Sequence, residues 1–291
     1  MTVLRALAPG KVNLCLFLGR PRADGLHPLV SVVAPVTLAD VLTLRPGRGE
    51  RDEVHCPGVP GENLAARALA VYRDHTGYDG PPVRIEIDKR VPVAAGMGGG
   101  SGDAAAALRL IAHAARQPSD PALFALAPGL GADVPSQIVP RRSLMTGAGE
   151  HVEILGDGPP IGLLIVPSGE RLSTPDVFRE ADRLGLPRSD EELAQREQEV
   201  RAALSAAGGA LPLELAVNDL EPAARSLCPS IDAALASLLA AGAARALVSG
   251  SGPTVFGIFE TPEAARAAQP HVPRSISAEP VTAAAAATLG P

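Results

Sequence analysis

The sequence has no tryptophan, two tyrosines and five phenylalanines among its 291 residues. Proteins that bind single-stranded nucleic acid stack the bases on aromatic side chains, and this chain has few of them. A formal charge of −6, from 26 basic and 32 acidic residues, also lacks the basic excess that neutralises phosphates in nonspecific nucleic-acid binding. Both shortages argue against nucleic acid as a partner, and they leave mainly Ala, Val and Leu to form the core.

Cysteines and long apolar runs are scarce as well. Cys15, Cys56 and Cys228 lie far apart, without the Cys/His spacing of a zinc site, which favours a reduced compartment and no structural metal. No apolar run approaches the roughly 18 residues that a membrane span requires. The N-terminal stretch carries Arg5 and Lys11, unlike the apolar block of a signal peptide. We therefore expect a cytoplasmic protein without a membrane partner.

What the chain does contain is typical of a folded globular protein: 46% of its residues are apolar and 20% are charged. Apolar periodicity predicts strands and helices along both halves. The predicted strands are 3–18, 30–44, 83–87, 161–166, 246–249, 255–259 and 276–281, and the predicted helices are 63–76, 104–116 and 231–240. Residues 183–207 are polar and charged, which predicts exposed helix and loop. Strands precede helices without strict alternation, so the predicted class is α+β.

A Gly- and Pro-rich stretch at 147–160 interrupts the periodicity near the middle of the chain. Domain boundaries fall in such segments, and the length of the chain allows one large or two modest domains. We predict an N-terminal domain at 1–152 and a C-terminal domain at 153–291.

The strongest local signal is a cluster of five glycines within residues 96–102, followed by an alanine-rich run at 104–116. Because glycine is unfavourable inside a helix and alanine is favourable there, we expect a glycine loop that leads into a helix. Unpaired amides and the helix dipole make such an N-terminus a phosphate site. The segment does not match the Walker lysine pattern, a clear dinucleotide fingerprint or the serine-hydrolase elbow. It is therefore a phosphate loop of another type.

Three further segments carry chemistry-bearing residues: Pro9-Gly10-Lys11-Val12-Asn13, Gly131-Ala132-Asp133-Val134-Pro135 and Ser249-Gly250-Ser251-Gly252-Pro253-Thr254. Taken singly, each has a plain structural interpretation, namely an edge-strand lysine, a turn aspartate and a tight hairpin. A lysine within an apolar strand otherwise needs a partner or a ligand, because burying its charge alone is costly.

Taken together, the segments resemble the GHMP kinase superfamily, whose three motifs follow this chain order. The matching stretches are APGKVNL at 8–14, RADGLHPL at 22–29, ENLAARAL at 62–69, IDKRVPVAAGMGGGSGDAA at 87–105, GADVP at 131–135 and VSGSGPT at 248–254. The resemblance implies an N-terminal domain like ribosomal protein S5 and a ferredoxin-like C-terminal domain, with the active site in the cleft between them.

The RADG-x-H segment and the IDK-R-V-P lead-in resemble one branch of that superfamily. This branch phosphorylates the 2-hydroxyl of 4-diphosphocytidyl-2-C-methyl-D-erythritol, a cytidine diphosphate sugar alcohol of the non-mevalonate isoprenoid precursor pathway. The resemblance thus implies an ATP-dependent small-molecule kinase that uses Mg²⁺ and acts as a monomer or homodimer. Another GHMP kinase or decarboxylase activity, or a non-catalytic nucleotide-binding relative, remains the alternative.

By the same resemblance, Lys11 and Asp133 are the catalytic pair. The implied ATP-binding residues are Asn63, Lys89, Pro92, Val93, Ala94, Ala95, Gly96, Met97, Gly98, Gly99, Gly100, Ser101 and Gly102. Those implied for the substrate are Asn13, Leu26, His27, Thr174 and Phe178, and the third motif is Ser249, Gly250, Ser251 and Gly252. Magnesium is expected to be held by phosphates and water, without dedicated protein ligands.

The chain departs from the family pattern at three places. Leu26 stands where the family usually has a tyrosine that stacks on the cytosine, and Gly102 replaces the second serine of the glycine loop. After Pro135 the chain continues with Ser136 and Gln137 instead of the usual Phe and Gly-Gly turn. The catalytic motifs match the family better than the motifs that set substrate specificity.

Overall fold

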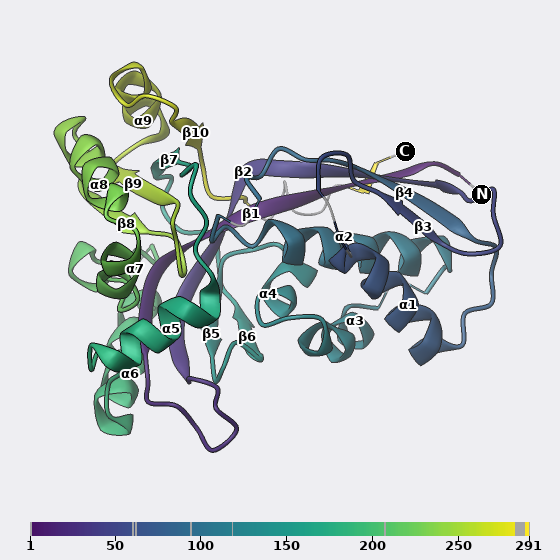
Figure 1. Ribbon diagram of the computed structural model, residues 1–291, viewed down its shortest axis with the longest axis horizontal. Coiled ribbons are helices and arrows are strands. Elements are labelled where there is room, and N and C mark those ends of the chain that lie inside the picture. The colour runs from purple at the N-terminus through teal and green to yellow at the C-terminus, as the bar shows by residue number, and fades with distance from the viewer. Residues whose placement is uncertain are drawn as a thin grey trace.

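Two β-sheets organise the molecule, and a long strand pair runs from the first sheet to beneath the second (Figure 1). The computed structural model describes residues 2–59, 61, 63–93, 95–117, 119–206, 208–282 and 289–290. The long pair consists of β1 (Leu4–Leu18) and β2 (Leu29–Pro46), which run antiparallel. Both confirm predicted strands. Val, Leu and Ala make up more than half of each, and most positions along both strands are buried.

The first sheet has the strand order β11-β1-β2-β4-β3, and a hairpin, β5–β6, branches from β2. Its further strands are β3 (Glu53–His55), β4 (Val83–Asp88), β5 (Ser143–Thr146), β6 (His151–Ile154) and β11 (Leu289–Gly290). The register of β1 against β2 shifts between Pro9 and Lys11 and again between Asn13 and Cys15. Such bulges bend a strand and re-aim its side chains, and these two flank Lys11, a predicted catalytic residue, and Asn13, a predicted substrate contact.

Helices α1 (Leu64–Thr76), α2 (Gly99–Ala114), α3 (Asp120–Leu126) and α4 (Val134–Ile138) cover one face of this sheet, with a 3-10 turn, η1 (Ala127–Gly129), between the last two (Figure 1). Helix α2 packs against α1, α4 and β1 and forms the centre of this layer. Its alanines from Ala104 to Ala107 are all buried, and their small size lets the neighbouring elements approach closely.

Helix α2 begins at Gly99, so the prediction that the glycine cluster lies outside the helix is wrong for its second half. Residues 99–102 form the first turn, and Gly98 is the N-cap at φ +65°. Tertiary packing outweighs the poor helix propensity of glycine here, since Gly102 packs against β1 where a Cβ would lie 2.9 Å from the Pro9 carbonyl oxygen.

The second sheet is antiparallel, with the order β10-β7-β9-β8. Its strands are β7 (Gly162–Val166), β8 (Arg245–Val248), β9 (Val255–Phe259) and β10 (Ile276–Ala278). Around them lie α5 (Thr174–Arg183), α6 (Asp190–Ser205), α7 (Glu221–Leu227), α8 (Ser230–Ala240), α9 (Pro262–Ala268) and the 3-10 turns η2 (Leu213–Leu215) and η3 (Gln269–His271). One core cluster joins this sheet to Val12 and Leu14 of β1, and another joins it to its helices.

The chain passes from the first sheet to the second between Ile154 and Gly162. Later segments of the chain contact the first sheet again. Helix α6 packs on β1 and β2, and β11 pairs with β1. The domain division at 152/153 stays a prediction. Across the described part of the chain, no helix combines the length and apolarity needed to cross a bilayer.

Candidate active site

A cavity of about 850 Å³ opens between the two sheets, within the size range of small-molecule sites. It gathers residues from segments far apart in the sequence. Of the predicted site residues, it is lined by Lys11, Asn13, Leu26, His27, Asn63, Lys89, Pro92, Val93, Ala95, Gly96, Met97, Gly98, Gly99, Gly100, Ser101, Asp133, Thr174, Phe178, Gly250 and Ser251. Ala94 lies outside the described residues.

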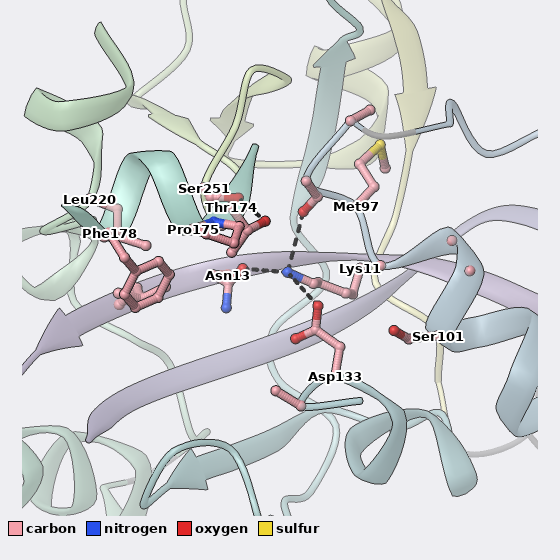
Figure 2. A pocket seen from close by; sticks show the side chains of 18 of the residues that line it. Lys11, Asn13, Met97, Ser101, Asp133, Thr174, Pro175, Phe178, Leu220 and Ser251 are labelled. Carbon is pink, nitrogen blue, oxygen red and sulfur yellow. Dashed lines mark hydrogen bonds and ion pairs between the residues drawn. The ribbon is translucent and has the colours of Figure 1, made fainter. Parts of the chain in front are cut away.

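The ammonium of Lys11 lies at the centre of this cavity and faces three acceptors (Figure 2). Its Nζ donates to Asn13 Oδ1 at 2.9 Å and to the Gly96 carbonyl at 3.2 Å, and it lies 3.6 Å from Asp133 Oδ2. An ammonium has three donors, so two are used in hydrogen bonds to Asn13 and Gly96 and the third remains available on the side of the Asp133 ion pair. This surrounding explains how a lysine can be buried in an otherwise apolar strand.

Asp133 immediately precedes α4, but its side chain does not cap that helix. The carboxylate points into the cavity toward Lys11 (Figure 2) and remains 36% exposed. It therefore combines an ion pair with access for a ligand. The Asn13 amide is fixed from behind, because Asn13 Nδ2 donates to Ser31 Oγ at 2.8 Å and that hydroxyl donates to the Cys15 carbonyl. Ser31 is a supporting residue that sequence reasoning missed.

The glycine loop and the first turn of α2 form one wall of the cavity. In the first turn of a helix, amides have no acceptor within the helix, which leaves the N–H groups of Gly99, Gly100 and Ser101 free for a ligand. Gly96 and Gly98 have φ values of +72° and +65°, and a Cβ on Gly96 would lie 2.4 Å from the Ser249 carbonyl oxygen. Glycine is thus required for the loop to pass this closely.

Gly102 belongs to the packing of α2 and not to the phosphate cradle. Its N–H donates to the Gly98 carbonyl at 2.8 Å as an ordinary helical bond, and the residue does not line the cavity. Its amide is thus already used within the helix, and the ATP contact of Gly102 stays a prediction that this geometry does not favour. Gly102, which stands where the family usually has its second serine, lies at the contact between α2 and β1.

Two of the four residues of the third motif line the cavity, and the other two lie behind its wall. Gly250 and Ser251 line the cavity, whereas Ser249 is buried with its Oγ 3.1 Å from the Gly96 carbonyl oxygen. Gly252 closes the turn by donating to the Ser249 carbonyl. The hydroxyls of Ser251 and Thr174 are 2.9 Å apart, which ties the start of α5 to this turn.

At the far end of the cavity, Leu26 is 52% exposed and the ring of Phe178 packs against that of His27 at 5.3 Å. His27 Nδ1 lies 2.9 Å from the Gly19 carbonyl oxygen and Nε2 lies 3.4 Å from Asp182 Oδ2. Nδ1 thus already has a hydrogen-bond partner, and a ligand that approaches Nε2 would meet the Asp182 carboxylate there. Asp182 and Arg179 line this end too, and neither was singled out from the sequence.

A buried charge cluster lies beneath the other end, next to Asn63. Lys89 Nζ is 2.5 Å from Asp40 Oδ2 and 2.8 Å from Asp103 Oδ2, so this predicted ATP contact is already neutralised by two carboxylates. Burial raises the pKa of Asp103 to about 7, although Lys89 acts to lower it. Asp40 is held further by the amides of Arg90 and Val91. Both aspartates were missed, since nothing local in the sequence pairs them with Lys89.

Comparison with known proteins gives the family. The GHMP kinases N terminal domain profile matches residues 63–139, and the GHMP kinases C terminal profile matches residues 193–277. A curated 4-diphosphocytidyl-2-C-methyl-D-erythritol kinase of Anaeromyxobacter dehalogenans (strain 2CP-C) is 41% identical over 276 residues, which covers 91% of this chain and 83% of that protein. The chain belongs to the 4-diphosphocytidyl-2-C-methyl-D-erythritol kinase family of GHMP kinases.

Other members of the kinase family agree. The relative from Streptomyces coelicolor is 43% identical and covers 84% of both chains. A crystal structure of 4-(cytidine 5′-diphospho)-2C-methyl-D-erythritol kinase superposes with a TM-score of 0.74 at 35% identity, covering 94% of this chain and 98% of that one. A homoserine kinase from Cytophaga hutchinsonii has a TM-score of 0.71 at 18% identity, with 97% and 95% covered, which shows the shared GHMP kinase fold alone.

Proposed function

We propose that this chain transfers the γ-phosphoryl group of ATP to the 2-hydroxyl of 4-diphosphocytidyl-2-C-methyl-D-erythritol in the non-mevalonate isoprenoid precursor pathway. The observation that carries the reaction type is the Lys11–Asp133 pair facing the free amides of α2 within one cavity. The substrate assignment rests on the family relatives, which carry that substrate in their names.

The ATP phosphates would lie against residues 96–101. The free amides of Gly99, Gly100 and Ser101 converge there with the positive end of the α2 dipole. A side chain on Gly98 would meet Lys11 at 3.1 Å, so the glycines leave the lysine accessible beside the phosphates. The base and ribose would extend toward Asn63, whose Oδ1 already caps α1 through the Ala65 amide.

The residues present fit a magnesium ion that is bound mainly through the nucleotide. Within the described residues, no group of three or more His, Cys, Asp or Glu side chains could hold a metal by itself, and magnesium commonly takes one or two protein oxygens beside phosphates and water. The Ser101 hydroxyl lines the cavity in the first turn of α2, where it could supply such an oxygen. When bound, the ion would offset phosphate charge during the transfer.

Asp133 would accept the proton of the attacking hydroxyl, because it is the exposed carboxylate nearest to Lys11 and the glycine loop. Lys11 would hold the Asp133 carboxylate in position through the ion pair and would stabilise the negative charge that develops on the transferring phosphoryl group. Its fixed position matters for this role: with Asn13 and Gly96 holding two of its donors, the ammonium needs little rearrangement during the reaction.

The cytidine end of the substrate would lie between Leu26 and Phe178, on the side of the cavity away from the glycine loop (Figure 2 labels Phe178). Leu26 supplies an apolar face where its relatives usually have tyrosine, and Phe178 supplies the aromatic one. Thr174 and Ser251 lie between this end and Lys11, where the diphosphate and sugar alcohol would pass.

The experiment is a measurement of ADP release from magnesium-ATP with the cytidylyl substrate, with mevalonate, with homoserine and without any acceptor. We expect rapid ADP release with the cytidylyl substrate alone, and a product phosphorylated on the 2-hydroxyl. Turnover of mevalonate or homoserine in its place would assign the chain to another GHMP reaction, and no turnover with any acceptor would support a non-catalytic relative.

A further inference from the structure

A second cavity borders β1 and shares no lining residue with the active-site cavity. Asn13 lines the active-site cavity, whereas its neighbour Leu14 lines this one. The second cavity measures about 480 Å³, roughly three times an engineered cavity of ~150 Å³ that holds one benzene molecule. Nothing in the proposed kinase reaction uses it.

The lining is apolar apart from two charged residues. Its apolar members are Leu14, Pro159, Ile161, Ala210, Leu211, Leu213, Ala216, Ala244, Ile258, Phe259 and Pro280, with Gly158 beside them. The charged ones are Glu260, an exposed residue, and Arg142, which is only 5% exposed. An apolar cavity with one buried cation is suited to a ligand that has an apolar body and one negative group.

Arg142 has more hydrogen-bonding capacity than the protein uses. Its Nη1 donates to the Gly209 carbonyl at 2.6 Å, while its buried Nε has no acceptor. Among the described residues, no carboxylate forms an ion pair with it. A guanidinium has five donors arranged as a planar fork, and leaving such a buried charge without an anion is costly.

The backbone at Gly158 packs directly against the guanidinium of Arg142. A Cβ on Gly158 would lie 2.6 Å from Arg142 Nη1, so glycine permits the chain to pass directly against the guanidinium. Burial lowers the pKa of Arg142 from its usual range, yet an arginine remains charged at neutral pH. The guanidinium is therefore a fixed, positively charged group in the wall of an apolar cavity.

We propose that this cavity binds an amphiphile composed of an aliphatic chain and one small anionic head group, a carboxylate or a phosphate monoester, with the head group on Arg142 and the chain among the apolar residues. A carboxylate or phosphate would accept a charge-assisted hydrogen bond from the part of the guanidinium that lines the cavity, since Nη1 already donates to Gly209 and Nε is enclosed by protein. The aliphatic chain would cover the Leu, Ile and Phe side chains that now line an open cavity.

The test measures binding of four probes by calorimetry to the full chain saturated with a non-hydrolysable ATP analogue, which blocks the phosphate site of the kinase centre. The probes are n-octyl phosphate, octanoate, n-octanol and inorganic phosphate. We expect at least one of the two anionic amphiphiles to bind about 10- to 100-fold more tightly than octanol, the range for hydrogen bonds to a charged group. Whichever anion binds more tightly identifies the head group.

Three variants locate the binding. Arg142→Met keeps the volume but removes the charge, and should reduce the affinity for the anions to that for octanol. Arg141→Met removes the neighbouring arginine, which does not line the cavity, and should leave all affinities unchanged. Ala244→Phe places a ring at an exposed lining position, so it should block octanol and the anions alike while leaving the fold intact.

The proposal is overturned if octanol binds as tightly as both anions, if inorganic phosphate binds as tightly as octyl phosphate, or if neither anionic amphiphile binds. Anion binding that persists in Ala244→Phe would place the ligand elsewhere and would overturn it as well. Because Ala244→Phe and the comparison with octanol do not alter Arg142, the proposal stays testable even if Arg142→Met fails to fold.

Discussion

The Lys11 ammonium lies 3.6 Å from the Asp133 carboxylate, although Lys11 is in β1 and Asp133 immediately precedes α4, far along the sequence. The lysine is buried and held by two further acceptors, whereas the aspartate is partly exposed. One partner is thus fixed and the other is accessible to a ligand. This asymmetry suits a base that is positioned by an immobile cation and remains open to the substrate hydroxyl.

We expect Asp133→Asn to lower kcat by about 10²- to 10⁴-fold, the usual contribution of a general base. ATP affinity should change little, because the amides of α2 do not involve this side chain. Steady-state kinetics and ATP binding measured on the same preparation would check both. The matched control is Asp232→Asn, which alters an exposed aspartate paired with Arg225 on the second sheet's helices. A variant at position 133 that keeps a tenth of the wild-type rate would remove Asp133 from this role.

Gly96→Ala should lower the free energy of unfolding by about 1–3 kcal/mol, the cost of a strained left-handed residue, and its Cβ would also clash with the Ser249 carbonyl oxygen at 2.4 Å. Gly100→Ala is the control. It lies in the first turn of α2 with nothing within 4 Å of its Cβ, and alanine is better than glycine in a helix by about 1 kcal/mol. Denaturant unfolding should therefore separate the two variants. Equal stability would contradict the close contact between the glycine loop and the third motif.

Asp103 should make the native state less stable as pH rises from about 4 to about 7. Its folded pKa is raised to about 7 from 3.8, so over this interval the native state binds the proton more tightly than the unfolded state. Its contribution is therefore present at low pH and is lost as pH rises through the folded pKa. The slope from one such group is at most about 1.4 kcal/mol per pH unit.

Asp103→Asn isolates this effect, because asparagine keeps an oxygen for Lys89 but does not titrate. Between pH 4 and pH 7, the unfolding free energy of the wild type should fall relative to that of the variant. Above pH 7, the difference between the two proteins should stay constant. Urea unfolding across this range measures that difference. A difference independent of pH would show that Asp103 ionises with an ordinary pKa.

Leu26→Tyr should tighten the binding of the cytidylyl substrate, since stacking of a base on an aromatic ring contributes about 1–3 kcal/mol. Leu26 is 52% exposed and lines the end of the cavity opposite the glycine loop, so affinity for ATP and kcat should change little. Leu239→Tyr is the control, because Leu239 is also 52% exposed but does not line the cavity. Weaker binding of the cytidylyl substrate would mean that this end is arranged around a different ligand.

The sequence by itself determined the elements whose signal is local. Alternating or continuous apolar residues predicted β1, β2 and β4, and alanine content predicted most of α2. The element predictions are confirmed because propensity and side-chain period depend on neighbours along the chain. The motifs around Lys11, the glycine loop and Asp133 are contiguous patterns too, and residues named from them line one cavity, while their roles stay predictions.

Only the tertiary structure decided features that depend on contacts between distant segments. The first turn of α2 includes Gly99 because packing on β1 outweighs propensity, and Lys89 is neutralised by Asp40 and Asp103 from two other elements. The buried, partly unpartnered Arg142 belongs in the same class. Whether a charged side chain is free, paired or poised for a ligand depends on the distances and burial set by folding, because electrostatic and desolvation energies are properties of the assembled environment and not of local sequence.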